Sequence, residues 1–221
     1  MNDEPKPSGT VVVLRDAEDL EVLLLQRASR DGKPGAWVFP GGKVDATDRR
    51  KDASAEHDAR RAAAREAAEE AALALEPETL VPISRWITPK ISPKRFDTWF
   101  FLVQAERSAA IRVDGQEIGA HRWLRPREAL SGHHDGSVRL APPTFVTLCW
   151  LTEFQRGAEA LDTWAPRPIP LFEPRIVRQP DGACILYAGD AGYEAIDPNA
   201  PGPRHRLWAG AGSWRYELRI G

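Results

Sequence analysis

The feature that most constrains the fold is a helix-forming segment between a glycine turn and a proline. Residues 53–75 contain no glycine or proline and are dominated by alanine, which has the highest intrinsic helix propensity. Pro77 follows two residues later, and proline cannot continue a helix. Upstream, the sequence WVFPGG predicts a short strand that ends at Pro40 and the glycine pair 41–42. The segment therefore predicts a strand, a tight turn, a charged loop and a long helix, in that order.

The remaining apolar runs predict a sheet. Residues 10–16 and 21–27 are rich in branched aliphatic side chains and are separated by a polar turn, which predicts a hairpin or two neighbouring strands. Two further strands are expected at residues 83–89 and 96–106. A short helix should open near Pro126, and an amphipathic helix should begin with Pro142 and Pro143. This order of elements predicts an α/β sandwich with a mixed sheet between helices.

The amino-acid composition of the chain changes at about residue 164, after which proline is frequent. The sequences PDG at 180–182 and GAG at 210–212 each separate two strand-like runs. We therefore expect a main domain at residues 1–164 and a β-rich extension at residues 165–221. Its many prolines make independent folding unfavourable, so the extension should pack on the main domain or on a partner subunit in a possible homodimer.

Charge and hydropathy argue against two classes of partner. The formal net charge of −2 gives no electrostatic reason to bind nucleic acid or anionic membranes. No apolar run approaches the ~20 residues that a membrane span requires, and the first nine residues lack the apolar core of a signal peptide. We expect a cytoplasmic protein with no nucleic-acid or membrane partner.

Four ionisable residues of the predicted helix stand close together in the sequence REAAEE. Glu66 precedes Glu69 by three residues and Glu70 by four, so the three carboxylates share a face and repel one another. Arg65 can hold Glu69, and a hard divalent cation suits the other carboxylates. The alternative is a surface helix with solvated acidic residues. The preceding glycine turn favours the metal site, because glycine lets a ligand approach the backbone.

The glycine turn, the loop and REAAEEAAL together resemble the Nudix box. In that motif, glycine is followed after five residues by glutamate, and after seven more by Arg-Glu-aliphatic-x-Glu-Glu-x-Gly-aliphatic. The matching positions are Gly41, Gly42, Arg65, Glu66, Glu69, Glu70 and Leu73.

The chain departs from this motif in four ways. Ala67 is a weak match to the first aliphatic position, and Ala72 replaces the final glycine. The spacing from glycine to arginine is longer by about nine residues, so the loop contains an insertion. The early glutamate has no clear counterpart: counting back from the arginine reaches His57, while Asp45 and Asp48 lie nearer the turn.

Residues 23–48, 85–103 and 140–145 further resemble the coenzyme A diphosphatase branch of the Nudix superfamily. This resemblance implies an α/β/α sandwich with a mixed sheet, and hydrolysis of a nucleotide-containing small molecule with Mg²⁺ or Mn²⁺. The expected substrate is coenzyme A or a derivative, cleaved to 3′,5′-ADP and 4′-phosphopantetheine. The alternatives are NADH or ADP-ribose as substrate, or a ligand-binding module of the same fold that does not hydrolyse.

The resemblance also implies roles for individual residues. The metal ligands would be the Gly41 carbonyl, Glu66, Glu69 and Glu70. Arg65 would orient a carboxylate, and Glu66 would serve as ligand or helper base. Glu117 matches an acidic residue of a later loop that acts as ligand or general base; the alternative is a solvated loop glutamate.

Basic residues near these segments are candidates for binding phosphates. Lys90, Lys94 and Arg95 cluster in one turn and could bind the additional phosphate of coenzyme A. The alternative is a solvated basic turn. Arg27 and Arg30 precede the box, at positions where coenzyme A hydrolases carry basic residues.

Overall fold

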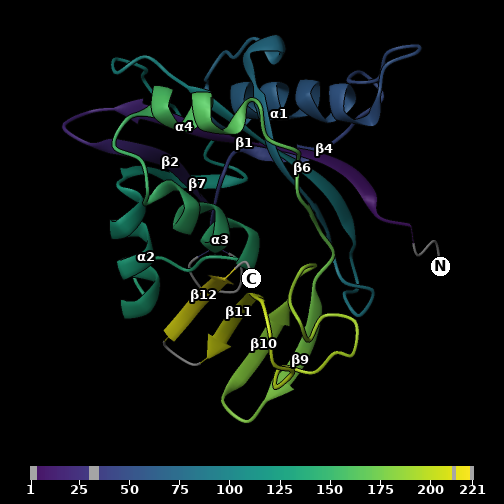
Figure 1. Ribbon diagram of the computed structural model, residues 1–221. Helices are drawn as coiled ribbons and strands as arrows, with labels where there is room; N and C mark the ends of the chain where they lie inside the picture. The colour runs from purple at the N-terminus through teal and green to yellow at the C-terminus, as the bar shows by residue number, and fades with distance from the viewer. Residues whose placement is uncertain (1–3, 30–34, 211–212, 220–221) are drawn as a thin grey trace.

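The computed structural model describes residues 4–29, 35–210 and 213–219 of the chain. Figure 1 shows a twisted mixed sheet that separates α1 (Ala55–Ala71) from α2 (Pro126–Asp135), α3 (Pro142–Leu151) and a smaller C-terminal sheet. A fourth helix, α4 (Gly157–Trp164), which the sequence did not predict, packs on the same core as α3. The predicted α/β/α sandwich with a mixed sheet is confirmed. Within the described residues, none of the helices combines the length and the apolar character needed to cross a membrane.

The large sheet is built around a central parallel pair. Its strands are β1 (Lys6–Asp16), β2 (Leu20–Arg27), β3 (Trp37–Val38), β4 (Gly41–Lys43), β5 (Val81–Ile87), β6 (Phe96–Gln104), β7 (Ile118–Leu124) and β8 (Leu171–Phe172). They follow the order β3-β2-β1-β6-β5-β8, with β4 paired to β1 and β7 to β2. The pairs β1–β6 and β5–β8 are parallel and the others antiparallel. The predicted hairpin of the first two strands is therefore confirmed.

Helix α1 lies close to the sheet because its inner face carries small side chains. That face consists of the fully buried residues Ala59, Ala62, Ala63, Ala67 and Ala71. A Cβ atom on Gly9 of β1 would lie 1.8 Å from the Ala59 carbonyl oxygen, so only glycine permits this approach. The contact holds the acidic residues of α1 next to β4, which pairs with the same strand.

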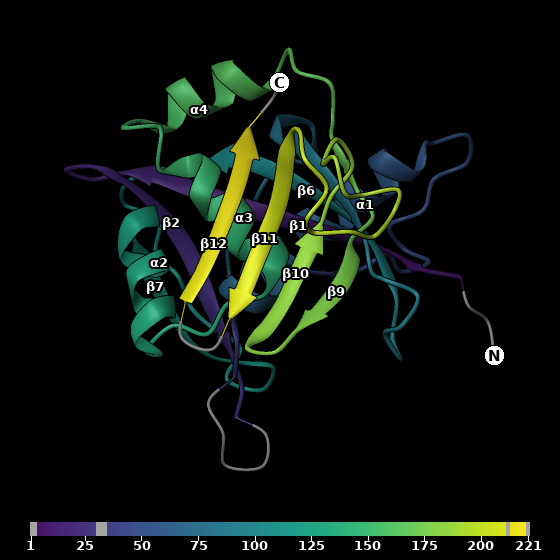
Figure 2. The ribbon, with the colours of Figure 1, turned by 60° about the horizontal axis from the view of Figure 1, so that its bottom comes forward.

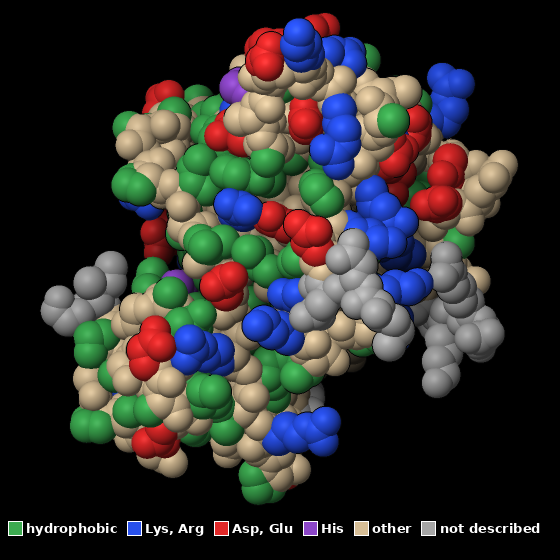
Figure 3. Space-filling model, turned by 90° about the vertical axis from the view of Figure 1, so that its right-hand side faces the viewer, with side chains coloured by type: hydrophobic (Ala, Val, Ile, Leu, Met, Phe, Trp, Pro, Cys, Tyr) green, Lys and Arg blue, Asp and Glu red, His purple; other side chains and the backbone are tan. Residues whose placement is uncertain are grey.

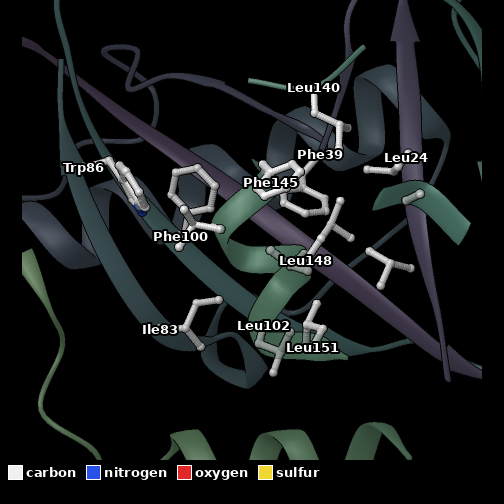
Figure 4. Packing of buried hydrophobic residues seen from close by; sticks show 14 of the residues in the cluster. Leu24, Phe39, Ile83, Trp86, Phe100, Leu102, Leu140, Phe145, Leu148 and Leu151 are labelled. Carbon is white, nitrogen blue, oxygen red and sulfur yellow. The ribbon is translucent and has the colours of Figure 1, made fainter. Parts of the chain in front are cut away.

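The opposite face of the sheet packs against α3. Figure 4 shows Phe145, Leu148 and Leu151 of this helix against Phe39, Phe100 and Leu102 of the sheet layer. The sequence predicted an amphipathic helix, but residues 144–148 are all buried. The C-terminal sheet explains the difference, because it covers the side of α3 that would otherwise face water (Figure 2).

The C-terminal sheet is antiparallel. Its strands β9 (Arg175–Gln179), β10 (Gly182–Leu186), β11 (Arg204–Gly210) and β12 (Ser213–Arg219) follow the order β12-β11-β10-β9. One face contributes Ile185 and Leu207 to the same hydrophobic cluster as the large sheet. The other face forms a smaller cluster around Cys184 and Leu186. The two strand pairs expected around PDG and GAG are present.

Helix α1 is shorter at both ends than the predicted span of residues 53–75. Ser54 caps its N-terminus, accepting a hydrogen bond from the His57 N–H. At its C-terminus Ala72 has a φ angle of 53°, and its N–H donates to the Ala67 and Ala68 carbonyls. This left-handed residue ends the helix, and it stands where the Nudix box carries glycine.

We expect Ala72→Gly to increase the free energy of unfolding by about 0.5–1 kcal/mol, because glycine adopts the left-handed region without steric cost. Urea denaturation followed by circular dichroism measures this difference. Ala68→Gly is the matched control: the same change at an exposed position within the same helix should destabilise by about 1 kcal/mol. Equal destabilisation by both changes would contradict the prediction.

Candidate active site

The glycine bend at β4 brings two carboxylates of α1 against the backbone. The Gly41 N–H donates to Glu70 Oε2 over 3.0 Å. A Cβ atom on Gly42 would lie 2.1 Å from Glu66 Oε1, so glycine leaves the space into which the Glu66 carboxylate fits. Glu66 and Glu70 are four residues apart on the helix and therefore reach the same bend.

Burial changes the acidity of both carboxyl groups. Burial raises the pKa of Glu66, against the attraction of Arg65. Burial also raises the pKa of Glu70 to about 7: the Gly41 hydrogen bond and the Arg27 charge lower it, and the Glu66 and Glu117 charges raise it further. Arg27 and Glu117 therefore share one electrostatic environment with the box, although they are distant from it in sequence.

Arg65 organises the surrounding charges. It donates to Glu69 Oε2 at 2.8 Å, the pair that the four-residue spacing predicts, and lies 3.1 Å from Glu66 Oε1. It also bonds the Lys43 carbonyl at 3.0 Å and both carboxylate oxygens of Asp48. The hydrogen bond with Asp48 raises the pKa of the Arg65 guanidinium. Arg65 thus ties the helix to the loop that follows the glycine bend.

Asp48 is the residue that sequence reasoning left without a role. It is 4% exposed and holds Arg65 at 3.0 Å, so it occupies the place of the early acidic residue of the box. Counting forward from the glycine turn identifies Asp48, because it follows Gly42 after five intervening residues, as the motif requires. Counting backwards failed because the insertion lies between Asp48 and Arg65. His57 instead lies 2.8 Å from the Ser54 hydroxyl at the start of α1.

Two carboxylates at the bend are oxygen donors of the kind that a divalent cation prefers. Glu66 and Glu70 place them beside one backbone turn, and burial there raises the pKa of Glu70 to about 7. Across the described parts of the chain, no three His, Cys, Asp or Glu side chains lie close enough together to hold an ion. Glu69 has a 59% exposed side chain and turns to Arg65. The structure therefore joins two of the three predicted acidic ligands at the bend.

Glu117 lies at the entrance to β7 on an ordered turn. Asp114 Oδ1 accepts hydrogen bonds from the N–H groups of Gln116, Glu117 and Ile118. The Ala28 N–H donates to the Glu117 carbonyl over 2.7 Å, which joins this turn to the end of β2. The exposed side chain of Glu117 is thereby held in the same region as Arg27.

A cleft of about 410 Å³ opens from the glycine bend. Arg27 and Gly41 are among its lining residues. The turn at residues 88–95 contributes Thr88, Pro89 and Ser92 to the wall, whereas the described lining includes neither Lys90 nor Lys94.

The predicted basic residues therefore have different surroundings. Lys90 and Lys94 are exposed on the turn. Arg95 Nε donates to the Thr88 carbonyl over 3.0 Å, which braces that turn. Arg30 lies outside the described residues. Figure 3 shows basic and acidic side chains next to one another across one face of the molecule.

Comparison with known proteins agrees with this geometry. The family model described as "NUDIX domain" matches residues 5–143, which is more than half of the chain. Acyl-coenzyme A diphosphatase NUDT19 of Xenopus laevis is 29% identical over 139 residues, covering 56% of this chain and 34% of that protein. Putative nudix hydrolase 7 of Caenorhabditis elegans is 26% identical over 182 residues, covering 66% of this chain and 60% of that protein. This chain thus spans about a third of the length of the frog relative.

Among solved structures, a Nudix hydrolase from Alicyclobacillus acidocaldarius superimposes with a TM-score of 0.65 and 26% identity. The superposition covers 76% of this chain and 100% of that chain. Family model, fold and box geometry agree, and we conclude that this chain belongs to the Nudix family.

Proposed function

We propose that this chain hydrolyses the diphosphate of a nucleotide-containing small molecule with the help of Mg²⁺ or Mn²⁺. The observation that carries the proposal is the convergence of Glu66 and Glu70 on the glycine bend, beside a cleft that Gly41 and Arg27 both line. A diphosphate is anionic and repels a nucleophile. A bound divalent cation would neutralise that charge and lower the pKa of a coordinated water.

The side chains of this site would divide the remaining tasks. Glu66 and Glu70 hold the cation, with the Gly41 carbonyl and Glu69 as further ligands. Arg65 keeps the acidic residues in place through its bonds to Asp48 and Glu69. Arg27, the one charged residue in the described lining of the cleft, binds a phosphate oxygen. Glu117 acts as general base or additional ligand, because its charge already acts on Glu70.

Coenzyme A or an acyl derivative is the substrate that we favour. The frog relative is named as an acyl-coenzyme A diphosphatase, and the mostly apolar cleft suits a long substituent. On this proposal, Lys90, Lys94 and Arg95 would lie near the additional phosphate of coenzyme A. NADH and ADP-ribose are the alternative substrates, and a ligand-binding module without turnover is the alternative function.

A substrate panel tests the proposal directly. Coenzyme A, octanoyl-coenzyme A, NADH and ADP-ribose are each incubated with Mg²⁺ or Mn²⁺, with and without EDTA, and the products are identified by mass spectrometry. We expect 3′,5′-ADP from the coenzyme A substrates and none with EDTA. Binding without product under every metal condition would favour the ligand-binding module.

We expect Asp48→Asn to lower kcat by about 10–100-fold, because residues that orient a metal ligand typically contribute that much. The asparagine keeps the shape of Asp48 but loses the charge that holds Arg65. Asp45→Asn is the matched control: Asp45 is 65% exposed and lies 3.7 Å from Arg65, so its loss should change kcat little. Equal effects of the two changes would argue against Asp48 as the residue that positions Arg65.

A further inference from the structure

The cleft beside the glycine bend has a mostly apolar lining with a single charged residue. Arg27 is the one charged residue in its described lining, which also includes Gly41. Phe39, Phe96 and Phe100 contribute to the apolar lining, together with residues of the C-terminal sheet. Its volume of about 410 Å³ lies within the range of about 300–1,000 Å³ that is usual for small-molecule sites.

The first turn of α3 adds to the apolar lining of the cleft. Pro142 and Pro143 line the cleft as the first two residues of that helix. A helix N-terminus normally attracts anions through its free N–H groups, but proline has no N–H to donate. The first turn of α3 therefore presents methylene groups to the cleft and favours an apolar occupant over a phosphate.

The C-terminal sheet contributes to the wall of the cleft through Ile176 of β9. Ile176 pairs directly with Ile185 of β10, and residues opposite each other in antiparallel strands point to the same face. Ile185 is buried in the core that this face shares with the large sheet, whereas Ile176 is 37% exposed. Both residues line the cleft. The apolar face of the C-terminal sheet is thus buried at Ile185 and accessible from the cleft at Ile176.

From these contacts we infer that the apolar lining of the cleft binds an acyl group attached to a diphosphate substrate, and that Ile176 determines the preference for acylated substrates. This inference rests on the proposed function for the identity of the substrate. An acyl group is the expected occupant because Gly41, Arg27 and Ile176 all line the same cleft, so a substituent of the bound diphosphate can lie against Ile176. The C-terminal extension would thereby act in substrate selection as well as in covering α3.

Equilibrium binding without turnover tests this inference. The dissociation constants of coenzyme A and octanoyl-coenzyme A are measured by calorimetry with the full chain in EDTA. The wild-type chain should bind octanoyl-coenzyme A at least about tenfold more tightly, since burying two methylene groups suffices for such a ratio. Ile176→Asp should reduce the ratio to about threefold or less, and Ile176→Val should retain most of it.

Leu218→Asp is the matched control, because Leu218 is an exposed aliphatic residue of the same sheet outside the described cleft lining. It should leave the affinity ratio unchanged. The inference is overturned if octanoyl-coenzyme A gains no affinity in the wild-type chain, or if Ile176→Asp and Leu218→Asp have equal effects. Tight octanoyl-coenzyme A binding without hydrolysis in Mg²⁺ would support the acyl site and refute only the proposed hydrolysis.

Discussion

Replacing Glu70 by glutamine should lower kcat for diphosphate hydrolysis by at least about 100-fold while the fold persists. Glutamine keeps the size of glutamate and can still accept the hydrogen bond from the Gly41 N–H. It removes the negative charge that would hold a divalent cation, whose stabilisation of the transition state is worth several kcal/mol. A 100-fold loss corresponds to about 2.7 kcal/mol, so the expected effect is within that range.

Steady-state kinetics over a Mg²⁺ titration, with circular dichroism as a check on folding, measures this effect. Glu66→Gln should be comparably severe, because both side chains meet the glycine bend. Glu76→Gln provides the matched control on an exposed glutamate beyond the helix. Full activity in both the Glu66 and the Glu70 variants would reject the metal site.

Glu69→Gln distinguishes between two roles of Glu69, as a ligand of the cation and as a partner of Arg65. Its side chain is largely exposed and pairs with Arg65. If Glu69 also binds the cation, the Mg²⁺ concentration for half-maximal activity should rise along with the fall in kcat. A fall in kcat with an unchanged Mg²⁺ requirement would instead identify Glu69 as a partner of Arg65 alone.

Asp190→Asn should lower the free energy of unfolding by about 3–5 kcal/mol, because it leaves the buried Arg206 without its counter-charge. The Arg206 and Asp190 side chains are 1% and 0% exposed and meet at 2.6 and 2.7 Å through two hydrogen bonds. Asp190 also accepts the Gly192 and His205 N–H groups at 2.8 Å. The pair therefore anchors the loop between β10 and β11 to the C-terminal sheet.

Urea denaturation measures this loss, and Glu194→Gln is its control. Glu194 forms an ion pair with Arg175 but has an 84% exposed side chain, so its loss should cost less than about 1 kcal/mol. Comparable costs for the two changes would contradict the importance assigned to the buried pair.

The stabilisation by Asp190 should also depend on pH. Burial alone would raise the pKa of Asp190, but the hydrogen bonds from Arg206, His205 and Gly192 outweigh burial and lower it. A carboxyl group with a lowered pKa in the folded state contributes fully above its unfolded pKa and loses that contribution on acidification. The difference between wild type and Asp190→Asn should therefore be constant from neutral pH to about pH 5 and shrink below about pH 4. A difference independent of pH would exclude the charge as its source.

Local signals in the sequence determined the order of the elements and the family. Alanine content and flanking prolines predicted α1, and branched apolar runs predicted the strands, because these features act over a few residues. Spacings of three and four residues placed Glu66, Glu69 and Glu70 on one side of a helix. The resemblance of REAAEEAAL to the Nudix box then assigned the chemistry.

Only the tertiary structure decided which of these residues meet. Helix periodicity predicted the pair of Arg65 with Glu69. It cannot tell that Glu66 and Glu70 reach the glycine bend, because that depends on how close α1 lies to β1 at Gly9. Asp48 pairs with Arg65 across the inserted loop. The path of that loop depends on tertiary packing, so the sequence alone did not reveal the pair. The cleft likewise joins Arg27 to Ile176 across most of the sequence, since contacts between distant segments arise from packing rather than from local propensity.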